Sequence, residues 1–470
     1  AIKRAKEKGI IIPTYAQMKN PDLIPNEIKE ELKNVGLHDL NPLNLFRINW
    51  HNEPTETGGL FKEGNYVVLP KELTGVDAKI VAISGKYFPT GAHKVGAAFS
   101  CLVPRLVTGQ FDPTTTKAVW PSTGNYCRGG AYDSALLGCE SIAILPEGMS
   151  KERFEWLEKV AGETIATPGT ESNVKEIFDK CWELKGSGQD LMIFNQFEEF
   201  GNYLWHYEIT GSFIENIINK VGGKYKGYVS STGSGGTIAA GDYLKKLWPT
   251  SKIVASEALQ CPTIYMNGFG EHRIEGIGDK HIPWVHNVKN TDAIVAMDDE
   301  IPMNMIRLFN EPEGKKLLKS MGVNEDVIAK LQWAGISGCA NIAAAIKMAK
   351  YFEMKEDDVI VTVLTDSMDM YNSRLAEMTE LHGEFTELEA YRVYHQYLQG
   401  INTEYIKELN YRERKAVHNL KYYTWVEQQG KTYEEICEQW DNDDYWTSIP
   451  EKLEELDKLI NAFNEAVKKI

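Results

Sequence analysis

The stretch Tyr228-Val-Ser-Ser-Thr-Gly233-Ser-Gly-Gly-Thr237-Ile-Ala-Ala-Gly241 joins a short apolar run to a helical pattern through glycines and hydroxyl residues. A strand that passes through such a loop into a helix directs several backbone N–H groups and the positive end of the helix dipole at one point, which suits a single phosphate. The loop lacks the Gly-Lys-Ser/Thr ending of a P-loop and does not read Gly-x-Gly-x-x-Gly, so ATP and dinucleotides are poorly supported. A flexible glycine turn without a ligand is the alternative interpretation.

A second loop, Pro89-Thr-Gly-Ala-His-Lys94-Val-Gly-Ala-Ala98, places a lysine where a helix of small residues is expected to begin. Burial among apolar neighbours and the positive end of a helix both disfavour the charged form of a lysine, which makes the amine available as a nucleophile. The alternative is a solvated surface lysine without a chemical role.

Two further loops carry polar residues directly after apolar runs. The loop Pro121-Ser-Thr-Gly-Asn125-Tyr-Cys-Arg-Gly-Gly130 offers hydroxyl, amide and N–H groups for a carboxylate or a ring hydroxyl, although taken alone it is also an ordinary turn. In Val361-Thr-Val-Leu-Thr-Asp-Ser367-Met-Asp-Met-Tyr371, the Asp-Ser pair could equally cap a helix. Because ligands of α/β sheets bind at the carboxyl ends of strands, all four loops are expected to meet at one crevice.

Short apolar runs alternate with helical patterns from about residue 78 to about residue 376. The runs lack strict polar alternation, which is typical of parallel strands covered on both faces. They lie at 78–83, 118–120, 141–145, 228–230, 252–255 and 359–364, with helical spacing at 150–160 and 238–248 between them. This alternation predicts an α/β fold with a parallel sheet.

The end of the chain is acidic, aromatic and helical in pattern. Ser448-Ile-Pro-Glu451 resembles a capping box. After it, apolar residues repeat at 3-4-3-4 spacing at Leu453, Leu456, Ile460, Phe463 and Val467. Since two and a half heptads are too few for a coiled coil, we predict a helix that packs on the body of the protein or across a dimer.

The composition restricts the possible partners and the compartment. The 470 residues include 51 Lys and Arg against 67 Asp and Glu, a formal net charge of −16, which disfavours nucleic acid and anionic membranes as partners. No apolar run of about 18 residues predicts a membrane span, and the basic opening residues lack the apolar segment of a signal peptide. Seven cysteines are scattered singly and no His-Glu-x-x-His motif occurs, so we expect reduced thiols, a cytoplasmic protein and no metal site.

Together the four loops resemble those of fold-type II pyridoxal-phosphate enzymes, most closely the cysteine synthase and cystathionine β-synthase branch. Similar stretches run in the same order between about residues 66 and 376: Asn195-Gln-Phe197, Asn202 with His206, Thr210-Gly211, Ala255-Ser-Glu257, Glu275-Gly-Ile-Gly278 and 335–345. The resemblance implies a tryptophan synthase β-like α/β fold, with a two-subdomain, three-layer α/β/α core. It implies a lead-in over 1–77, a catalytic core over 78–376 whose small subdomain spans about 95–210, and a helical C-terminal extension over 377–470.

The resemblance also assigns roles by position, with pyridoxal 5′-phosphate as the cofactor. Lys94 would bind the cofactor covalently and later move the substrate α-proton. Asn125 would hydrogen-bond the 3′-oxygen of the cofactor, and Ser367 would meet the pyridine nitrogen, which a neutral hydroxyl leaves unprotonated. The remaining assignments are Gly233, Ser234, Gly235, Gly236 and Thr237 to the phosphate, and Ser122, Thr123 and Gln196 to the substrate α-carboxylate.

The implied reaction is β-replacement on a β-substituted L-amino acid, such as O-acetylserine or O-phosphoserine with a thiol or sulfide, through an α-aminoacrylate. β-Elimination from serine, threonine, cysteine or diaminopropionate is the alternative, and a PLP subunit of a larger complex is a third. The resemblance implies a small amino acid as substrate and a homodimer as the assembly.

Some residues depart from the cysteine synthase pattern. The lysine loop is nearer to that of the tryptophan synthase β-subunit than to the Ser-x-Lys form, yet no Glu precedes Ser-Thr-Gly-Asn, which counts against indole as a substrate. Tyr126, Cys127 and Arg128 replace the usual Thr and Gly. Arg128 could bind a second carboxylate or a sulfonate of the substrate, or point outward and pair with an acid. Cys127 could be redox-sensitive or an inert packed thiol.

Overall fold

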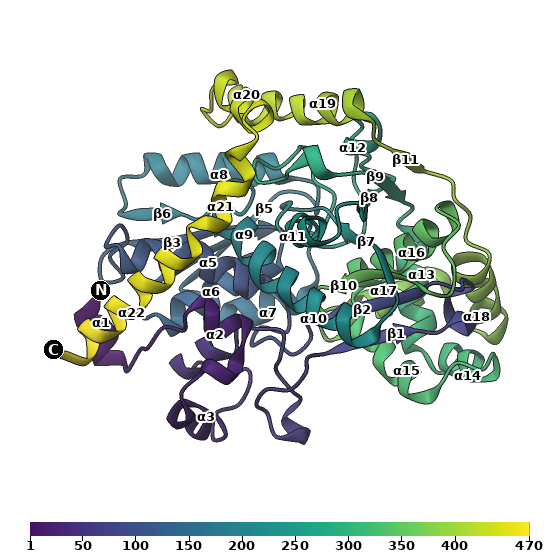
Figure 1. Cartoon of the computed structure of the whole chain (residues 1–470), viewed down its shortest axis with the longest axis horizontal. Coiled ribbons are helices and arrows are strands. Elements are labelled where there is room, and N and C mark those ends of the chain that lie inside the picture. Colours follow the sequence, from purple (N-terminus) through teal and green to yellow (C-terminus); the bar gives the residue numbers. More distant parts are fainter. Residues whose placement is uncertain (470) are drawn as a thin grey trace.

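Two β-sheets organise the protein, and the computed structural model describes residues 1–469 (Figure 1). The smaller sheet is entirely parallel and has the strand order β5-β4-β3-β6. Its strands are β3 (Lys117–Pro121), β4 (Ser141–Pro146), β5 (Glu163–Thr167) and β6 (Leu191–Ile193). α6 (Asn125–Leu136) packs on β3 and β4, and α8 (Val174–Gly186) contributes apolar side chains to a separate core with the same strands.

The larger sheet has the order β1-β2-β10-β7-β8-β9-β11, with parallel pairing inside and antiparallel strands at both edges. Its strands are β1 (Tyr66–Leu69), β2 (Lys79–Ser84), β7 (Lys224–Ser231), β8 (Lys252–Ala258), β9 (Ala293–Met297), β10 (Asp358–Leu364) and β11 (Ile406–Glu408). All six predicted strands are therefore present, and the parallel α/β prediction is confirmed.

The central strand β10 explains why its sequence is apolar without alternation. Successive side chains of a strand point to opposite faces. Ile360 and Leu364 accordingly join the core that contains α16 (Ile336–Tyr351), whereas Val361 and Val363 join the core that contains α10 (Gly211–Val221) and α11 (Ala239–Leu247). Both faces of the sheet are thus covered by helices, which gives the expected three-layer α/β/α core.

Besides the edge strands β1 and β11, three strands of the two sheets lie outside the six predicted runs. β5 lies at the edge of the smaller sheet and is largely accessible to solvent, so its sequence carries no apolar run. β6 has only three residues. β9 is wholly buried and apolar, but its run is short and lies next to the stretch from Gly276 to Asn290, which contains no extended helix.

After β10 the chain continues as a mostly helical extension around the body of the protein. α17 (Asn372–His382) and α18 (Glu387–Tyr394) lie beside the larger sheet, and β11 then pairs with β9, so the extension is not purely helical. The chain crosses above both sheets as α19 (Tyr411–Asn419) and α20 (Tyr433–Asp441), and it returns as α21 (Asp444–Glu451) and α22 (Leu453–Lys469) to the N-terminal end (Figure 1).

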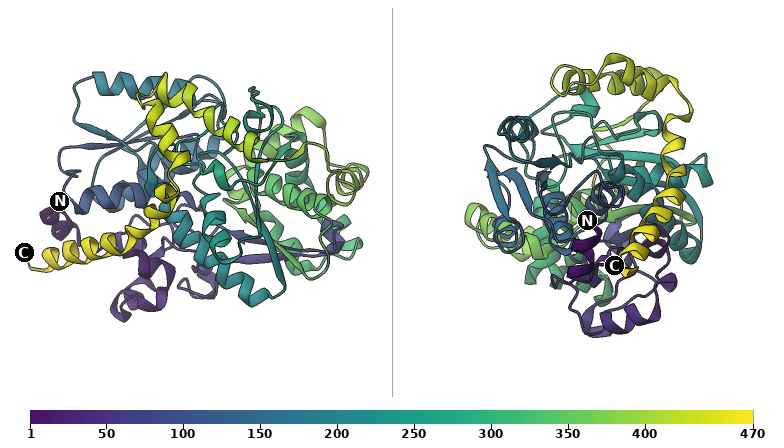
Figure 2. Two further views of the ribbon diagram at one scale, coloured as in Figure 1. Left: turned by 45° about the horizontal axis from the view of Figure 1, so that its top comes forward. Right: turned by 90° about the vertical axis from the view of Figure 1, so that its left-hand side faces the viewer.

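The last helix, α22, packs on the body of the protein, which is one of the two arrangements predicted from the sequence. Ile460, Phe463 and Val467 are buried in the core that includes α5 (Lys94–Val107), and α22 also contacts α1 (Ile2–Lys8) beside the N-terminus (Figure 2). The predicted capping box is wrong. Ser448 lies inside α21, where its hydroxyl donates to the carbonyl of Tyr445 over 3.0 Å, and α22 begins at Leu453.

No helix among residues 1–469 combines the length and the hydropathy needed to cross a membrane.

Candidate active site

The four loops singled out in the sequence meet at one cavity between the two sheets. Three of them follow β2, β3 and β7, and the fourth follows β10. Two contacts join the lysine loop to the loop after β10. Ala92 forms an isolated β-bridge with Asp366, and the His93 N–H donates to the Thr365 carbonyl over 3.1 Å. The predicted residues that line the cavity are Lys94, Ser122, Thr123, Asn125, Gln196, Gly233, Ser234, Gly235 and Thr237.

Lys94 is the first residue of α5 and points into this cavity. Its Nζ donates to Ser234 Oγ over 2.5 Å and to Gln196 Oε1 over 3.2 Å. Burial lowers the pKa of the Lys94 amine to about 8, and the nearby carboxyl of Asp279 opposes that shift. The lysine therefore touches both the glycine-rich loop and the residue predicted to bind a carboxylate, and much of its amine is neutral near pH 8.

The glycine-rich loop is shaped as a cradle that side chains would fill. A Cβ at Gly233 would lie 2.7 Å from the carbonyl oxygen of Gly276, and Gly235 has φ 74°, in the left-handed region. Among the described residues, the backbone N–H groups of Gly233, Ser234, Gly235 and Thr237 donate no hydrogen bond. Free N–H groups around a concave turn are suited to an anion, so the loop fits a phosphate.

Gly236 faces away from the cavity. A Cβ there would collide with the side chain of Asn202, whose Nδ2 donates to Ser234 Oγ over 2.9 Å and to the Gln196 carbonyl over 2.9 Å. Thr237 is fixed from another direction, because His93 Nε2 lies 2.8 Å from its Oγ1. The loop is thus supported by residues behind it while its N–H groups stay free.

The loop after β3 is held by the larger sheet as well as by its own helix. Gln196 Nε2 donates to Ser122 Oγ over 3.3 Å, and the Gly124 N–H donates to the same oxygen over 3.0 Å. Asn125 opens α6, and its Nδ2 donates to Asp366 Oδ2 over 2.7 Å. Two loops from different sheets are thereby joined at the cavity.

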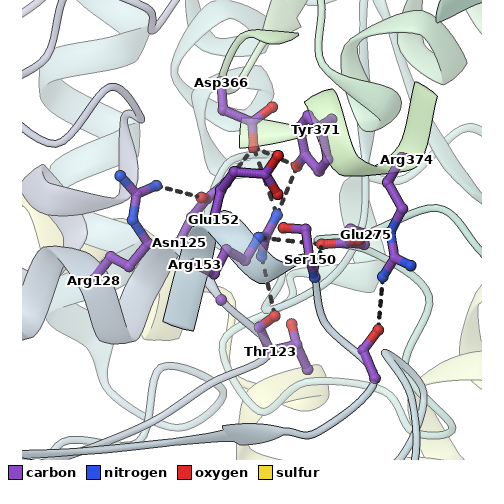
Figure 3. Close-up of polar contacts among 12 residues, drawn as sticks. Thr123, Asn125, Arg128, Ser150, Glu152, Arg153, Glu275, Asp366, Tyr371 and Arg374 are labelled. Carbon is purple, nitrogen blue, oxygen red and sulfur yellow. Dashed lines mark hydrogen bonds and ion pairs between the residues drawn. The ribbon is translucent and has the colours of Figure 1, made fainter. Parts of the chain in front are cut away.

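A buried arginine lies at the centre of the contacts between the two sheets (Figure 3). Arg153, from α7 (Lys151–Val160), donates from Nη1 to the Thr123 carbonyl over 3.1 Å and from Nη2 to the Tyr371 hydroxyl over 2.6 Å. Its Nε lies 3.2 Å from Glu275 Oε2, and its Nη2 lies 3.7 Å from Asp366 Oδ2. Its contacts thus connect the substrate loop with residues that follow β8 and β10.

Around this centre, other pairs join the same parts of the chain. Arg374 donates from Nε to Glu275 Oε1 over 2.7 Å and from Nη2 to the Gly148 carbonyl over 2.7 Å. Ser373 donates from its hydroxyl to Glu152 Oε2 over 2.6 Å. The network therefore holds the two sheets in a fixed relation beside the cavity.

Besides Gly236, two predicted site residues lie outside the lining of the cavity. Arg128 is buried over the ring of Trp156, donates from Nη2 to the Thr90 carbonyl over 2.6 Å and from Nη1 to Asn125 Oδ1 over 3.3 Å. Ser367 is buried, and its hydroxyl donates to Asp369 Oδ2 over 3.0 Å. The structure thus brings neither side chain to the cavity surface.

Cys127 is fully buried beside the substrate loop. Its Sγ donates to the Gly124 carbonyl over 2.9 Å, and burial raises the pKa of the thiol to about 12. A thiol that stays protonated and packed is a poor nucleophile, so the geometry favours the inert alternative.

Residues that the sequence analysis missed also line the cavity. Asp279 follows the Glu275-Gly-Ile-Gly278 stretch directly, and neither of its carboxylate oxygens has a hydrogen-bond partner among residues 1–469. Burial raises its pKa to about 7, an effect that Lys94 opposes. Burial also raises the pKa of Glu171, which lies near Arg153 and Asp279. In the sequence, the only sign of Asp279 was its position directly after the Glu275-Gly-Ile-Gly278 stretch.

Thr365 is a further residue of this kind. It lines the cavity beside Lys94, and its hydroxyl lies 2.9 Å from Ser337 Oγ. Thr365 directly precedes the Asp366-Ser367 pair that the sequence analysis singled out, so the pattern pointed to the neighbouring residues of the same loop.

The family profile of the pyridoxal-phosphate dependent enzymes matches residues 85–366, more than half of the chain. This chain belongs to that family. It is therefore an enzyme with pyridoxal phosphate as its cofactor, and the free N–H groups, the glycine cradle and Lys94 in one cavity fit that group. The matched segment contains the first three loops and the fourth as far as Asp366, and it ends before the C-terminal extension.

Two relatives of this chain in the pyridoxal-phosphate dependent family have names that refer to sulfur-containing amino acids. A cysteine synthase of Staphylococcus aureus is 31% identical over 313 residues, which cover 66% of this chain and 93% of the relative. The cystathionine β-synthase of Saccharomyces cerevisiae is 27% identical over 323 residues, covering 66% of this chain and 60% of the relative.

Solved structures share the fold. A hydrogen sulfide-producing enzyme of Fusobacterium nucleatum has a TM-score of 0.57 at 24% identity and covers 73% of this chain and 93% of its own. An O-acetylserine-dependent cystathionine β-synthase of Helicobacter pylori has a TM-score of 0.55 at 24% identity, covering 66% and 94%. With its relatives, the chain belongs among enzymes of β-replacement or β-elimination.

Proposed function

We propose that this enzyme carries out β-replacement on a β-substituted L-amino acid, of the O-acetylserine or O-phosphoserine type, with a thiol or sulfide as nucleophile. The proposal rests on one observation above all: Lys94 Nζ contacts both Ser234 of the glycine-rich loop and Gln196 beside the substrate loop. A lysine in that position can hold the cofactor while its amine stays within reach of the substrate α-carbon. The cysteine synthase relatives support the same reaction.

The roles predicted for the cofactor phosphate, the 3′-oxygen, the α-proton and the substrate carboxylate are supported by residues that line the cavity. The free N–H groups of the glycine-rich loop would hold the phosphate, and the Asn125 amide would hold the 3′-oxygen of the ring. Bound pyridoxal phosphate supplies an electron sink for the pair released at the substrate α-carbon. Lys94, as a neutral amine, would take up the α-proton. Ser122, Thr123 and Gln196 would bind the α-carboxylate through their hydroxyl and amide donors.

For the pyridine nitrogen we propose a hydroxyl partner, as the Ser367 assignment implies. Two candidates stand in the same loop, and Thr365 is favoured over Ser367 because Thr365 lines the cavity. Replacing Thr365 with Val should change the absorbance of the bound cofactor, whereas replacing Ser367 with Ala should leave it unchanged. The opposite result would return the role to Ser367.

β-Elimination is the second candidate, and Asp279 is the observation that favours it. A buried carboxyl without a partner and with a pKa of about 7 is suited to give a proton to a poor leaving group such as hydroxide or a thiolate. Acetate is a good leaving group and departs from O-acetylserine without a proton from the enzyme. Asp279 would therefore assist the loss of hydroxide or thiolate from serine or cysteine, the substrates predicted for elimination.

A substrate screen separates the two reactions. We propose to follow pyruvate release and thiol consumption with O-acetylserine, O-phosphoserine, serine and cysteine, each with and without sulfide. Replacement predicts little pyruvate and rapid formation of the sulfur product once sulfide is present. Pyruvate release from serine or cysteine that sulfide does not alter would establish elimination, and no turnover of any of these amino acids would support a subunit that needs a partner.

We also propose a cytoplasmic homodimer, with the chain divided into a lead-in over 1–77, a core over 78–376 and an extension over 377–470. The proposed division follows the family match, which lies inside the core. Light scattering with size-exclusion chromatography should give twice the 53.1 kDa mass of one chain. A mass of one chain at micromolar concentration would contradict the dimer.

A further inference from the structure

The C-terminal extension reaches the wall of the cofactor cavity through a short loop at residues 282–286. This loop lies between β8 and β9 and is buried at every position. The extension begins after the part of the chain that matches the family profile.

Three buried side chains of the extension bind the backbone of the 282–286 loop. Lys421 Nζ donates to the carbonyls of Trp284 over 3.0 Å and His286 over 2.9 Å, and to Gln439 Oε1 over 2.7 Å. Trp425 Nε1 donates to the Ile282 carbonyl over 2.8 Å. Gln439 Nε2 donates to the Trp284 carbonyl over 3.2 Å. These buried polar contacts fix the loop backbone, and among the described residues the Ile282 carbonyl has no other donor if the Trp425 bond is lost.

The other side of the same loop touches the glycine-rich loop. At Gly235 a Cβ would lie 2.9 Å from His286 Cβ and 3.3 Å from Pro283 Cβ, so the two backbones are in direct contact. The Val285 N–H also donates to the carbonyl of Phe197, a residue that lines the cavity. The 282–286 loop is therefore held between the extension and the proposed phosphate site.

Trp425 additionally connects the two sheets of the core. It packs with Trp284 and Phe178 at ring-centre distances of 5.9 and 6.2 Å, in one buried cluster with Val174 and Phe197. Phe178 belongs to α8, on the smaller sheet, whereas Trp284 belongs to the segment between β8 and β9 of the larger sheet. One extension residue thus fixes both parts of the core beside the cavity.

We propose that Lys421, Trp425 and Gln439 are positioning residues for the cofactor phosphate. By holding the 282–286 loop against Gly235, they keep the glycine-rich loop in the shape in which its N–H groups converge. The extension is then part of the cofactor site, although none of its residues lines the cavity among those described. This proposal rests on the phosphate site proposed above.

The test compares two tryptophans of the extension in the full-length protein. Trp425→Phe removes the hydrogen bond to Ile282 and keeps an aromatic ring. Trp440→Phe is the matched control, because Trp440 is equally buried and its Nε1 donates to the Tyr411 hydroxyl over 3.3 Å, within the extension itself. The readouts are the Kd of pyridoxal phosphate for the apo-protein, the 31P chemical shift of the bound cofactor and the thermal unfolding of the apo-protein.

We expect Trp425→Phe to weaken cofactor binding about five- to tenfold and to shift the 31P signal, in keeping with the loss of one buried hydrogen bond. Trp440→Phe should change the Kd of the cofactor by less than twofold and leave the 31P signal unshifted. This should hold even if the variant unfolds at a lower temperature. If Trp425→Phe does not fold, Gln439→Met takes its place, with the same expectation.

Equal effects of Trp425→Phe and Trp440→Phe would overturn the proposal, because the extension would then contribute to stability alone. Unchanged cofactor affinity and 31P shift in Trp425→Phe would overturn it as well. Gly233→Val separates this failure from failure of the phosphate site, because a side chain at Gly233 would collide with the Gly276 carbonyl and displace the N–H groups of the loop. Weaker binding in Gly233→Val with unchanged binding in Trp425→Phe would reject only the role of the extension, whereas unchanged binding in Gly233→Val would reject the phosphate site and with it this proposal.

Discussion

Asn125 and Asp366 form a hydrogen bond that joins the two sheets beside the cavity, with Asn125 Nδ2 donating to Asp366 Oδ2 over 2.7 Å. Tyr371 donates its hydroxyl to the same oxygen over 2.6 Å, and Arg128 Nη1 donates to Asn125 Oδ1. The Asn125 amide is thus held on both sides. Its orientation is set before any ligand binds, which is the preorganisation that a cofactor-binding amide needs.

Replacing Asp366 with Asn should loosen this amide, because a neutral amide oxygen accepts less strongly from both Asn125 and Tyr371. We expect kcat/KM to fall about tenfold or more and the free energy of unfolding to fall by about 2 kcal/mol. Steady-state kinetics and urea unfolding measure the two effects. Asp369→Asn is the control, since Asp369 pairs with Lys86 near the surface and such pairs contribute little. Equal losses in both variants would contradict the assignment.

Lys94→Ala should abolish activity, because no other amine lines the cavity among residues 1–469. Borohydride reduction followed by mass spectrometry should attach the cofactor mass to the native chain and not to this variant. Lys347→Met is a fitting control: Lys347 is also buried and its pKa is also lowered to about 8, but its Nζ donates to the Glu404 carbonyl far along the chain. A cofactor mass that persists in Lys94→Ala would move the covalent site elsewhere.

The pH dependence of cofactor uptake should follow the pKa of Lys94. The amine reacts only when neutral, and burial lowers its pKa to about 8. Uptake by the apo-protein should therefore rise roughly tenfold per unit below pH 8 and level off above about pH 9. Stopped-flow absorbance measures this rate. An ordinary lysine would keep rising to about pH 10.5, and such a profile would show that Lys94 is not desolvated.

Asp279→Asn should separate the substrates with poor leaving groups, which were predicted for elimination, from O-acetylserine. If Asp279 protonates the leaving group, turnover of serine or cysteine should fall about 100-fold, while O-acetylserine turnover changes little. Loss of this carboxyl should also lower the pKa of Lys94, because Asp279 raises it. Asp133→Asn is the matched control, since Asp133 is a buried carboxyl without a partner on α6 and does not line the cavity. Equal losses on all substrates would argue against the acid role.

Arg153→Met should destabilise the protein, because it leaves Asp366 buried without its ion-pair partner and Glu275 with Arg374 alone. Breaking a buried ion pair costs about 3–5 kcal/mol of unfolding free energy. We expect that loss in urea unfolding, together with a higher KM, since Arg153 also holds the Thr123 carbonyl of the substrate loop. Arg105→Met, which breaks a partly exposed pair with Glu199, should cost about 1 kcal/mol or less. A comparable loss from both arginines would mean that the network adds little.

The strands and the four loops were predictable from the sequence because their signals are local. A buried parallel strand such as β10 must be apolar on both faces, and a loop that receives an anion must contain residues such as Gly233 and Gly235. Among the missed strands, β5 is largely exposed and β6 has three residues, so they leave almost no local signal, whereas the buried β9 is a short run beside a stretch without an extended helix. The capping box at Ser448 failed for a related reason: the tertiary contacts of α21 kept the helix continuous through Pro450.

What the sequence determined by itself is the parallel α/β fold, the family and the residue types of the cavity, since each depends on a few adjacent positions. Only the tertiary structure decided which side chains reach that cavity. Arg128 and Ser367 turn away while Asp279 and Thr365 turn in, because orientation depends on the distant partners that each polar group finds. The same holds for Lys421, whose acceptors Trp284 and His286 lie more than 130 positions earlier in the chain. Burial of a polar group requires a partner, and that partner is known only once the chain has folded.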